Sequence, residues 1–180
     1  MRLFLGIPLP DDLLDVIEKY ESNKEFKKFK ITWIKRDNLH ITLKFLGEVQ
    51  GEKLNLIKIN LSKALKGYQF FYLKPVDINA FPSDHNLRMI SLNFEPLLQL
   101  SKIVNYIEIA LEALGFSKEA RLFRPHVTLS RLKDKIDKEK LLEIFKKNKF
   151  EFDKIRVDKI ILYESILDKH GAKYCVVEEY

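Results

Sequence analysis

Apolar positions recur with the period of a strand in some parts of the chain and with the period of a helix in others. Leu3–Ile7 is a short apolar run closed by Pro8 and Pro10, which predicts a buried strand. Asn38–Leu46 alternates between polar and apolar residues as far as Phe45, which predicts a half-buried strand. The apolar face of this second strand consists of Leu39, Ile41, Leu43 and Phe45.

Helical spacing recurs in four segments. Asp11 is a candidate N-cap for the first helix and Asp137 for the last. Pro96 and Gly115 bracket the clearest helix, because proline favours the first turn and glycine the residue after the last turn. The apolar stripes of the four helices are Leu13, Val16, Ile17 and Tyr20; Leu54, Ile57, Leu61 and Leu65; Leu97, Leu100, Val104, Ile107, Leu111 and Leu114; and Leu141, Leu142, Ile144 and Phe145.

Shorter apolar segments complete the expected fold. They predict strands over 31–34, 68–73, 88–94, 122–132, 155–167 and 173–177, with turns at Pro82–Asn86 and His170–Gly171. Each half of the chain has a helix, then a strand with a His-x-Thr sequence, then another helix. This order predicts a pseudo-duplicated α+β fold, with an antiparallel sheet in each lobe and helices outside. Because no linker rich in Pro, Gly or Ser divides the chain, we expect residues 1–180 to form one two-lobed domain.

The composition excludes several classes of protein. The longest charge-free run, Leu3–Pro10, is far shorter than the roughly 20 residues of a membrane span, and the N-terminus does not have the pattern of a signal peptide. The single cysteine, Cys175, cannot form an internal disulfide or a cysteine-based zinc site. We therefore expect a protein of the reducing cytoplasm, with no membrane partner.

The net charge of +6 is compatible with an RNA or DNA partner, and equally with a protein that has none. Before the first His-x-Thr strand the chain carries a cluster of cations, which are Lys24, Lys27, Lys28, Lys30, Lys35 and Arg36. Two interpretations remain open for this cluster: guidance of an RNA backbone, and an ordinary solvated face.

Two His-x-Thr sequences, His40-Ile41-Thr42 and His126-Val127-Thr128, are the strongest chemical signal. The chain has only four histidines and three threonines, so two such pairs would arise by chance with a probability of roughly 0.002. On a strand, residues i and i+2 face the same side, so each motif presents an imidazole and a hydroxyl together. Two imidazoles can act as acid and base near neutral pH, and hydroxyls can bind an anionic oxygen. The set suits a phosphodiester, with one histidine activating water and the other protonating the leaving ribose oxygen.

With Trp33 before the first motif and Arg124-Pro125 before the second, the chain resembles the two-histidine (2H) phosphoesterases. Within them it is most similar to the RNA 2′,3′-cyclic phosphodiesterases, first named 2′-5′ RNA ligases. The resemblance spans nearly the whole chain. The sequences that carry it are Met1–Phe4, Asn38–Glu48, Arg124–Leu129, Glu164-Ser165-x-Leu167 and Gly171-Ala172-x-Tyr174.

The resemblance implies a bilobal fold with the active site in a central cleft that carries both motifs. It also implies opening of a 2′,3′-cyclic phosphate at an RNA end to a 2′-phosphate, without a metal or another cofactor. Some members join tRNA halves through a 2′-5′ bond. By analogy His40 is the proton donor and His126 the acceptor, an order that the spacing does not determine. We expect a monomer whose partner is RNA with such an end, including tRNA halves.

Four further residues beside the histidines are candidate contacts for substrate. Thr42 and Thr128 are expected to bind phosphate, although a strand-forming role alone would explain a β-branched residue there. Lys44 shares the predicted face of the first histidine, and Arg124 that of the second. For both cations, contact with phosphate and a solvated surface position remain open.

Arg131 also fits the family pattern, but strict alternation puts it on the opposite face from His126. Only a bulge or the end of the strand would bring it into the site. Phe4, Trp33 and Phe45 are candidates for stacking on a base, although alternation directs Phe45 into the core.

The other interpretations concern a metal and catalysis itself. His85 and His170 lie in turn-like sequence and are expected in exposed loops. We expect no metal site, because the two motif histidines lack a recognisable third ligand. The alternative function is a non-catalytic nucleotide- or RNA-binding module of the same fold. The presence of both motif histidines argues against it.

Overall fold

A computed structural model describes residues 1–29, 31–83, 86–132, 137–169 and 171–180. Its strands are β1 (Arg2–Pro8), β2 (His40–Glu48), β3 (Phe71–Leu73), β4 (Pro75–Ser83), β5 (Asn86–Phe94), β6 (His126–Arg131), β7 (Ile155–Val157), β8 (Ile161–Asp168) and β9 (Gly171–Glu179). Its helices are α1 (Asp11–Glu21), α2 (Leu54–Ala64), α3 (Leu98–Glu112) and α4 (Lys138–Lys147), with short 3₁₀ turns η1 (Phe26–Lys28), η2 (Arg36–Asn38) and η3 (Gly51–Lys53). Among the described residues, no helix is long and apolar enough to cross a membrane.

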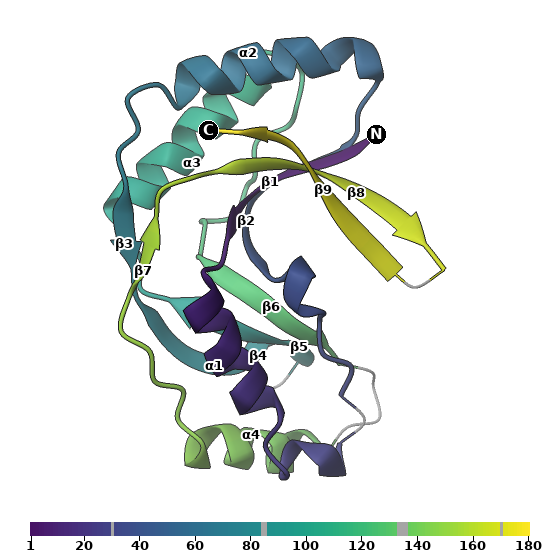
Figure 1. The fold of residues 1–180 in the computed structure, drawn as a ribbon, viewed down its shortest axis with the longest axis vertical. Coiled ribbons are helices and arrows are strands. Elements are labelled where there is room, and N and C mark those ends of the chain that lie inside the picture. Colours follow the sequence, from purple (N-terminus) through teal and green to yellow (C-terminus); the bar gives the residue numbers. More distant parts are fainter. Residues whose placement is uncertain (30, 84–85, 133–136, 170) are drawn as a thin grey trace.

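Seven strands form one antiparallel sheet in the order β4-β5-β6-β2-β1-β8-β9, and β3 pairs with β7 in a small second sheet (Figure 1). The large sheet has two halves, β9-β8-β1-β2 and β6-β5-β4, which meet where β2 pairs with β6. The side chains at this junction, Ile41 and Val127, are fully buried. The predicted α+β class is confirmed, and the antiparallel sheets expected in the two lobes are joined into one.

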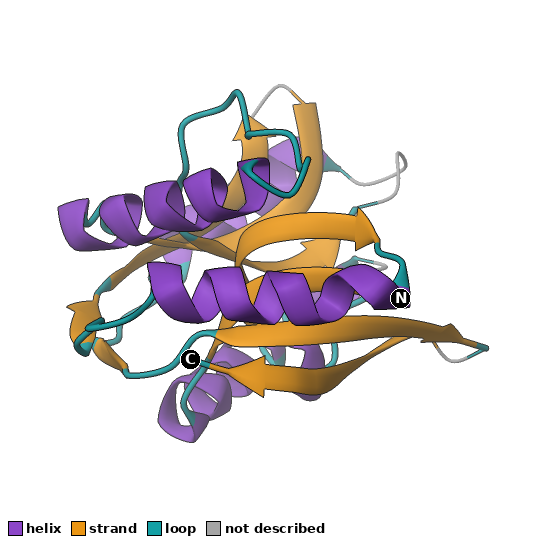
Figure 2. Ribbon diagram, turned by 90° about the horizontal axis from the view of Figure 1, so that it is seen from above, coloured by secondary structure: helices purple, strands orange, loops and turns teal. Residues whose placement is uncertain are grey.

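Each pair of neighbouring helices combines one helix from the first half of the chain with one from the second half (Figures 1 and 2). α2 and α3 pack together at the end of the molecule that holds β1, β8 and β9, whereas α1 and α4 lie at the other end. The last turn of α1 and the segment after it contact the end of α4. The Tyr20 hydroxyl donates to the Asn148 carbonyl, and Lys147 pairs with Glu25 at 3.0 Å. Each end of the molecule is therefore built from one helix of each half of the chain.

Two predicted strands differ from those observed, and one observed strand was not predicted. Residues 31–34 form no strand, and Trp33 makes a single bridge to Ser130. The strand predicted over 155–167 is divided into β7 and β8, which belong to different sheets. The pattern does not predict β4, because proline, aspartate and asparagine are depleted in strands. Its position at the edge of the sheet, where β5 is its one ladder partner among the described strands, tolerates them.

One predicted helix cap is confirmed and one is wrong. The Asp137 side chain accepts a hydrogen bond from the Lys140 amide at 3.2 Å and caps α4. Before α1 the N-cap is Pro10, and Asp11 is the first helical residue, where a negative charge still favours the helix N-terminus. His170 and part of the predicted turn at Pro82–Asn86, including His85, lie outside the described residues.

Both motif strands contain a bulge one residue after the threonine. In β2 the ladder to β1 skips Leu43, and in β6 the ladder to β5 skips Leu129. The six residues from each histidine therefore show the same sequence of burial: half-buried, buried, half-buried, buried, buried and exposed. The bulges reverse the alternation, so the fifth residue turns away from the motif face and the sixth turns toward it.

The bulge in β2 overturns two predictions. Lys44 does not share the face of His40; its ammonium lies 2.7 Å from Glu108 Oε2 on α3 and donates to the Ser117 carbonyl. The Lys44 and Glu108 side chains are only 3% and 10% exposed, so this is a buried ion pair. Phe45 does not enter the core and is 65% exposed.

We expect Glu108→Ala to lower the free energy of unfolding by about 3–5 kcal/mol, because it leaves the buried Lys44 ammonium without its carboxylate. Urea unfolding at pH 7 followed by circular dichroism measures this. Replacing both charges, Lys44→Met with Glu108→Leu, should recover most of the loss. Glu112→Ala removes a half-exposed carboxylate from the same helix and should cost less than about 1 kcal/mol. Similar losses for Glu108→Ala and Glu112→Ala would contradict the assignment.

Candidate active site

The two His-x-Thr motifs face each other across the β2–β6 pair. Because Ile41 lies opposite Val127 in an antiparallel ladder, His40 comes opposite Thr128 and Thr42 opposite His126. Antiparallel neighbours are related by a local twofold axis, and here that axis passes between the two central residues. The pairing therefore places two imidazoles and two hydroxyls on one face of the sheet.

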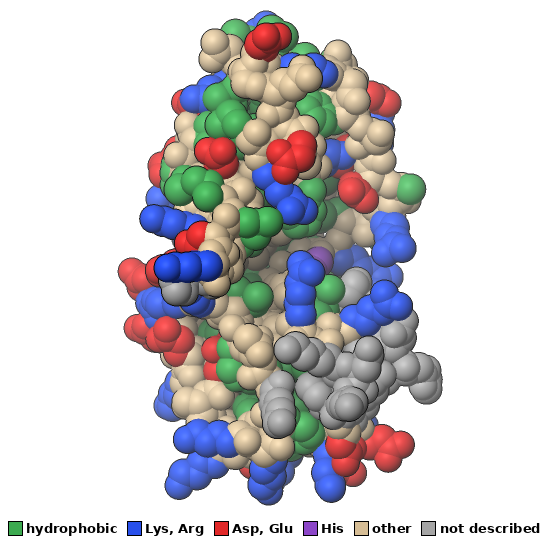
Figure 3. Space-filling view, turned by 90° about the vertical axis from the view of Figure 1, so that its right-hand side faces the viewer, with side chains coloured by type: hydrophobic (Ala, Val, Ile, Leu, Met, Phe, Trp, Pro, Cys, Tyr) green, Lys and Arg blue, Asp and Glu red, His purple; other side chains and the backbone are tan. Residues whose placement is uncertain are grey.

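All four motif side chains line one cavity of about 400 Å³. The full lining is Arg2, Leu3, Phe4, Ile34, Asn38, His40, Thr42, Phe45, Gly47, His126, Thr128, Arg131, Ser165, Leu167, Ala172 and Tyr174. Among these described residues there is no Asp or Glu. Figure 3 looks onto the recess, where a histidine lies set back between the upper and lower parts of the molecule with Lys and Arg side chains around it.

Both imidazoles are held in the same tautomer by the backbone. His40 Nδ1 lies 2.8 Å from the Asn38 carbonyl, and His126 Nδ1 lies 2.9 Å from the Arg124 carbonyl. A carbonyl oxygen only accepts, so each Nδ1 carries a proton, and Nε2 is the nitrogen of each neutral ring that can accept one. In the free site Thr42 Oγ1 lies 3.0 Å from His40 Nε2, and its hydroxyl therefore donates to this nitrogen when His40 is neutral.

The structure separates the predicted cations. Arg131 lines the cavity, because the bulge at Leu129 turns it to the face of the second motif. Arg124 contributes its carbonyl, while its exposed side chain is not part of the lining. Lys44 is held away from the cavity by Glu108.

Three aromatic residues were candidates for contact with a base. Phe4 and Phe45 both line the cavity, with their ring centroids 5.9 Å apart. Trp33 instead packs edge-on against Phe26, at 5.6 Å between ring centroids. Arg2, which no pattern singled out for substrate, also lines the cavity. The family resemblance begins at Met1–Phe4, and this was the available signal.

Comparison with known proteins identifies the family. The chain matches the LigT like Phosphoesterase family over residues 7–91 and 93–174. It belongs to this family. The RNA 2′,3′-cyclic phosphodiesterase of Methanocaldococcus jannaschii is 36% identical over 181 residues, covering 100% of both chains. That of Thermotoga maritima is 31% identical over 184 residues, covering 99% of this chain and 94% of the relative. The predicted family and its class of enzyme, a phosphoesterase, are confirmed.

Solved structures share the fold of this LigT-like phosphoesterase. The protein TT0787 of Thermus thermophilus superposes with a TM-score of 0.81 at 21% identity, covering 100% of this chain and 97% of that one. E. coli LigT complexed with 3′-AMP gives a TM-score of 0.80 at 23% identity, covering 99% and 96%. In the described part of this phosphoesterase, no three His, Cys, Asp or Glu side chains gather as a metal would require.

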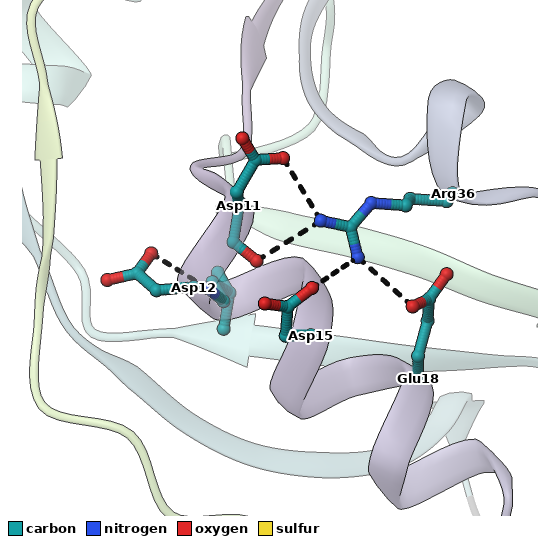
Figure 4. Close-up of polar contacts among 6 residues, drawn as sticks. Asp11, Asp12, Asp15, Glu18 and Arg36 are labelled. Atoms are coloured by element: carbon teal, nitrogen blue, oxygen red, sulfur yellow. Dashed lines mark hydrogen bonds and ion pairs between the residues drawn. The ribbon is translucent and has the colours of Figure 1, made fainter.

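The turn before β2 is anchored on two sides. Arg36 in η2 bonds to carboxylates of Asp11, Asp15 and Glu18 on α1, at 3.0, 2.8 and 3.1 Å (Figure 4). Two residues on, the Asn38 side chain donates to the Ala172 carbonyl of β9 at 2.7 Å. The carbonyl that orients the first catalytic candidate is therefore fixed by both α1 and β9. These contacts also engage Arg36, one of the cations considered for guiding RNA.

The two imidazoles have different surroundings despite their symmetric placement. The ring of His40 packs against Phe4 and Tyr174, with centroid distances of 4.7 and 5.2 Å, and Tyr163 lies 6.2 Å away. Burial of the ring lowers the pKa of His40; the hydrogen bond to the Asn38 carbonyl acts in the opposite direction, and the charge of His126 lowers it further. The net shift is downward, so His40 is neutral at neutral pH in the free protein.

We expect the ring protons of His40 to titrate below the ordinary histidine pKa of about 6.5. NMR of the imidazole C–H resonances between pH 4.5 and 8 measures this. His126→Ala should raise the midpoint, because it removes a nearby positive charge, but burial should keep it below the ordinary value. Added inorganic phosphate that binds in the cavity should also raise it. A midpoint at or above the ordinary value in the free protein would contradict this account.

Gly6 lets β1 approach the first histidine. A Cβ at this position would lie 3.2 Å from His40 Cδ2 and 3.1 Å from the Ile41 carbonyl oxygen. We expect Gly6→Ala to shift the His40 ring resonances and to lower the free energy of unfolding by about 1–3 kcal/mol, through overpacking. Gly51→Ala is the matched control, because a Cβ there meets nothing within 4 Å. Unchanged His40 resonances in Gly6→Ala would show that the contact does not constrain the ring.

Proposed function

We propose that this protein opens 2′,3′-cyclic phosphates at RNA ends to 2′-phosphomonoesters, by acid–base catalysis with His40 and His126. The observation that carries the proposal is the arrangement of two imidazoles, each with its Nδ1 bonded to a backbone carbonyl, opposite two threonine hydroxyls in one cavity. The relatives named RNA 2′,3′-cyclic phosphodiesterase support the choice of substrate.

In the proposed reaction the cyclic phosphate lies between the two motifs. His126 Nε2 accepts a proton from water, and the water oxygen forms a bond to phosphorus. The bond from phosphorus to O3′ breaks, and His40 Nε2 donates a proton to O3′. The product is a 2′-phosphate, and the two histidines then exchange protons with solvent. The order of donor and acceptor comes from the family resemblance.

The surroundings of the two histidines fit these roles. Since burial lowers the pKa of His40, its imidazolium is a stronger acid than that of an exposed histidine. The anionic phosphate stabilises the imidazolium form in the complex, so His40 takes up a proton from solvent when the substrate binds. Thr42 and Thr128 are half-buried in the cavity, and in the proposed complex their hydroxyls turn from His40 Nε2 and Met89 Sδ to donate to phosphate oxygens as charge develops.

Two cavity residues beyond the motifs are proposed contacts for the nucleotide. The guanidinium of Arg131 is exposed on the motif face and suits a phosphate oxygen. The ring of Phe45 is 65% exposed and offers a stacking surface to a base. We do not carry Lys44 forward as a substrate contact, because its ammonium is buried against Glu108.

The proposal includes independence from metal ions and the joining of tRNA halves through a 2′-5′ bond. Two imidazoles supply both proton transfers, so no step requires a bound metal to activate water. Joining is the reverse type of reaction at the same centre, with an RNA hydroxyl in place of water. The product identifies which outcome occurs: a 2′-phosphate, a 3′-phosphate or a joined strand.

We expect the wild-type protein to convert RNA ending in a 2′,3′-cyclic phosphate to the 2′-phosphate in the presence of EDTA. His40→Ala and His126→Ala should each lower kcat by about 10²–10⁴-fold, because each removes one proton transfer. Product analysis by mass spectrometry, with phosphatase treatment and chromatography to place the phosphate, measures the outcome. Thr32→Val replaces an exposed threonine outside the cavity and should keep wild-type turnover.

Three results would contradict the proposal. Full turnover in either folded histidine variant would remove that residue from the chemistry. Loss of wild-type activity in EDTA, with recovery on addition of a divalent cation, would contradict the metal-independent reaction. Tight binding of the cyclic end without conversion would instead identify a non-catalytic binding module.

A further inference from the structure

The cavity continues beyond the motif residues along β1 and β2. The ring of Phe4 contacts His40, and Phe4 pairs with Phe45 across the ladder. Arg2 is two residues from Phe4 on the same face of β1, which places it about 7 Å farther along the strand. From the catalytic pair outward, the lining therefore presents an aromatic surface and then a guanidinium.

Arg2 is available to a ligand. Its side chain is exposed, and it takes part in none of the hydrogen bonds or ion pairs between described residues. Glu48 lies opposite it in the ladder, but Glu48 Oε2 is 3.8 Å from the N-terminal ammonium, and the side chain is 79% exposed. With no carboxylate among the described lining residues, this end of the cavity favours an anion.

The chemistry of an RNA end provides such an anion. A terminal nucleotide carries the cyclic phosphate on its ribose and is linked through its 5′ oxygen to the preceding nucleotide by a phosphodiester. The two anions of this nucleotide lie on opposite sides of one nucleoside. In the cavity, the four His-x-Thr side chains and Arg2 likewise lie on opposite sides of the Phe45 ring.

We propose that Arg2 binds the phosphodiester that precedes the terminal nucleotide, so that the site recognises a strand and not a single nucleotide. This inference rests on the proposed function, since it takes the motif pair as the site of the cyclic phosphate. Guanidinium groups bind phosphate oxygens through charge-assisted hydrogen bonds with two N–H donors. Arg2 is a specificity-determining residue in this proposal and takes no part in the proton transfers.

Arg131 offers the competing direction for the strand. In the antiparallel β2–β6 pair it lies beyond Thr128, at the His40 end of the motifs, whereas Phe45 and Arg2 lie at the His126 end. A strand that leaves the site toward Arg131 would not reach Arg2. The two arginines therefore make opposite predictions for the same measurement.

The test uses a dinucleotide, ApA, that carries a 2′-phosphate and has either a natural phosphodiester or a neutral methylphosphonate between its nucleosides. Calorimetric titration at low salt gives Kd for both ligands. Wild-type protein should bind the methylphosphonate about tenfold more weakly, and Arg2→Gln should bind the natural ligand about tenfold more weakly and no longer distinguish the two. Arg121→Gln, an exposed arginine outside the cavity, should behave as wild type.

The inference would be overturned if Arg2→Gln kept the wild-type ratio of the two Kd values, or if only Arg131→Gln lost it. Equal binding of the two ligands by the wild-type protein would also overturn it. Because the ligand is a product and needs no turnover, failure of the proposed hydrolysis leaves this measurement decisive. A second measurement compares the turnover of ApA ending in a cyclic phosphate with the turnover of 2′,3′-cyclic AMP. The ratio of dinucleotide to mononucleotide turnover should fall about tenfold in Arg2→Gln.

Discussion

In the antiparallel pair of β2 and β6, Ile41 lies opposite Val127 and both side chains are fully buried. Each such side chain contributes about 1.5–3 kcal/mol on leaving water. A slip of one residue would move these side chains to the cavity face and turn the histidines and threonines into the core. The burial that fixes the register of the core therefore also fixes the opposed His-x-Thr pairs, and the site depends on it.

The bulges extend this arrangement beyond the motifs. Without the bulges, Phe45 and Arg131 would face the core, and the cavity would lose both side chains. On the core side of the sheet, the bulge in β2 turns Lys44 inward, where its ammonium contacts Glu108 on α3. In β6 the equivalent buried residue is Ser130, whose hydroxyl donates to the Thr32 carbonyl at 2.9 Å. Both strands thus use a buried polar side chain at the same position.

The β2–β6 pair is locally symmetric, but the strands next to β2 and β6 differ. β2 lies next to β1, which brings Phe4 against the ring of His40, and the β8–β9 hairpin adds Tyr163 and Tyr174. β6 lies next to β5, and His126 on it is half-buried. Burial lowers the pKa of His40. Two matching motifs consequently hold their histidines beside different strands, and burial against aromatic rings shifts the pKa of His40 in the direction that an acid role would use.

The sequence by itself determined the local elements and the candidate catalytic groups. Period-2 alternation identified the two motif strands, and the scarcity of histidine and threonine made His40, Thr42, His126 and Thr128 stand out. The antiparallel α+β class followed from the order of the elements. These features depend on the spacing of residues within a single strand or helix, which can be read from the sequence.

The tertiary structure decided what depends on neighbours in space. A bulge arises from the pairing of two strands, and the alternation of one strand does not locate it. Strict alternation therefore assigned Lys44 and Phe45 to the wrong faces and left Arg131 undecided. The edge position that allows Pro75–Ser83 to form β4 is equally a property of the sheet. The aromatic surroundings of His40 and the place of Arg2 in the cavity come from the order β2-β1-β8-β9, which local spacing does not encode.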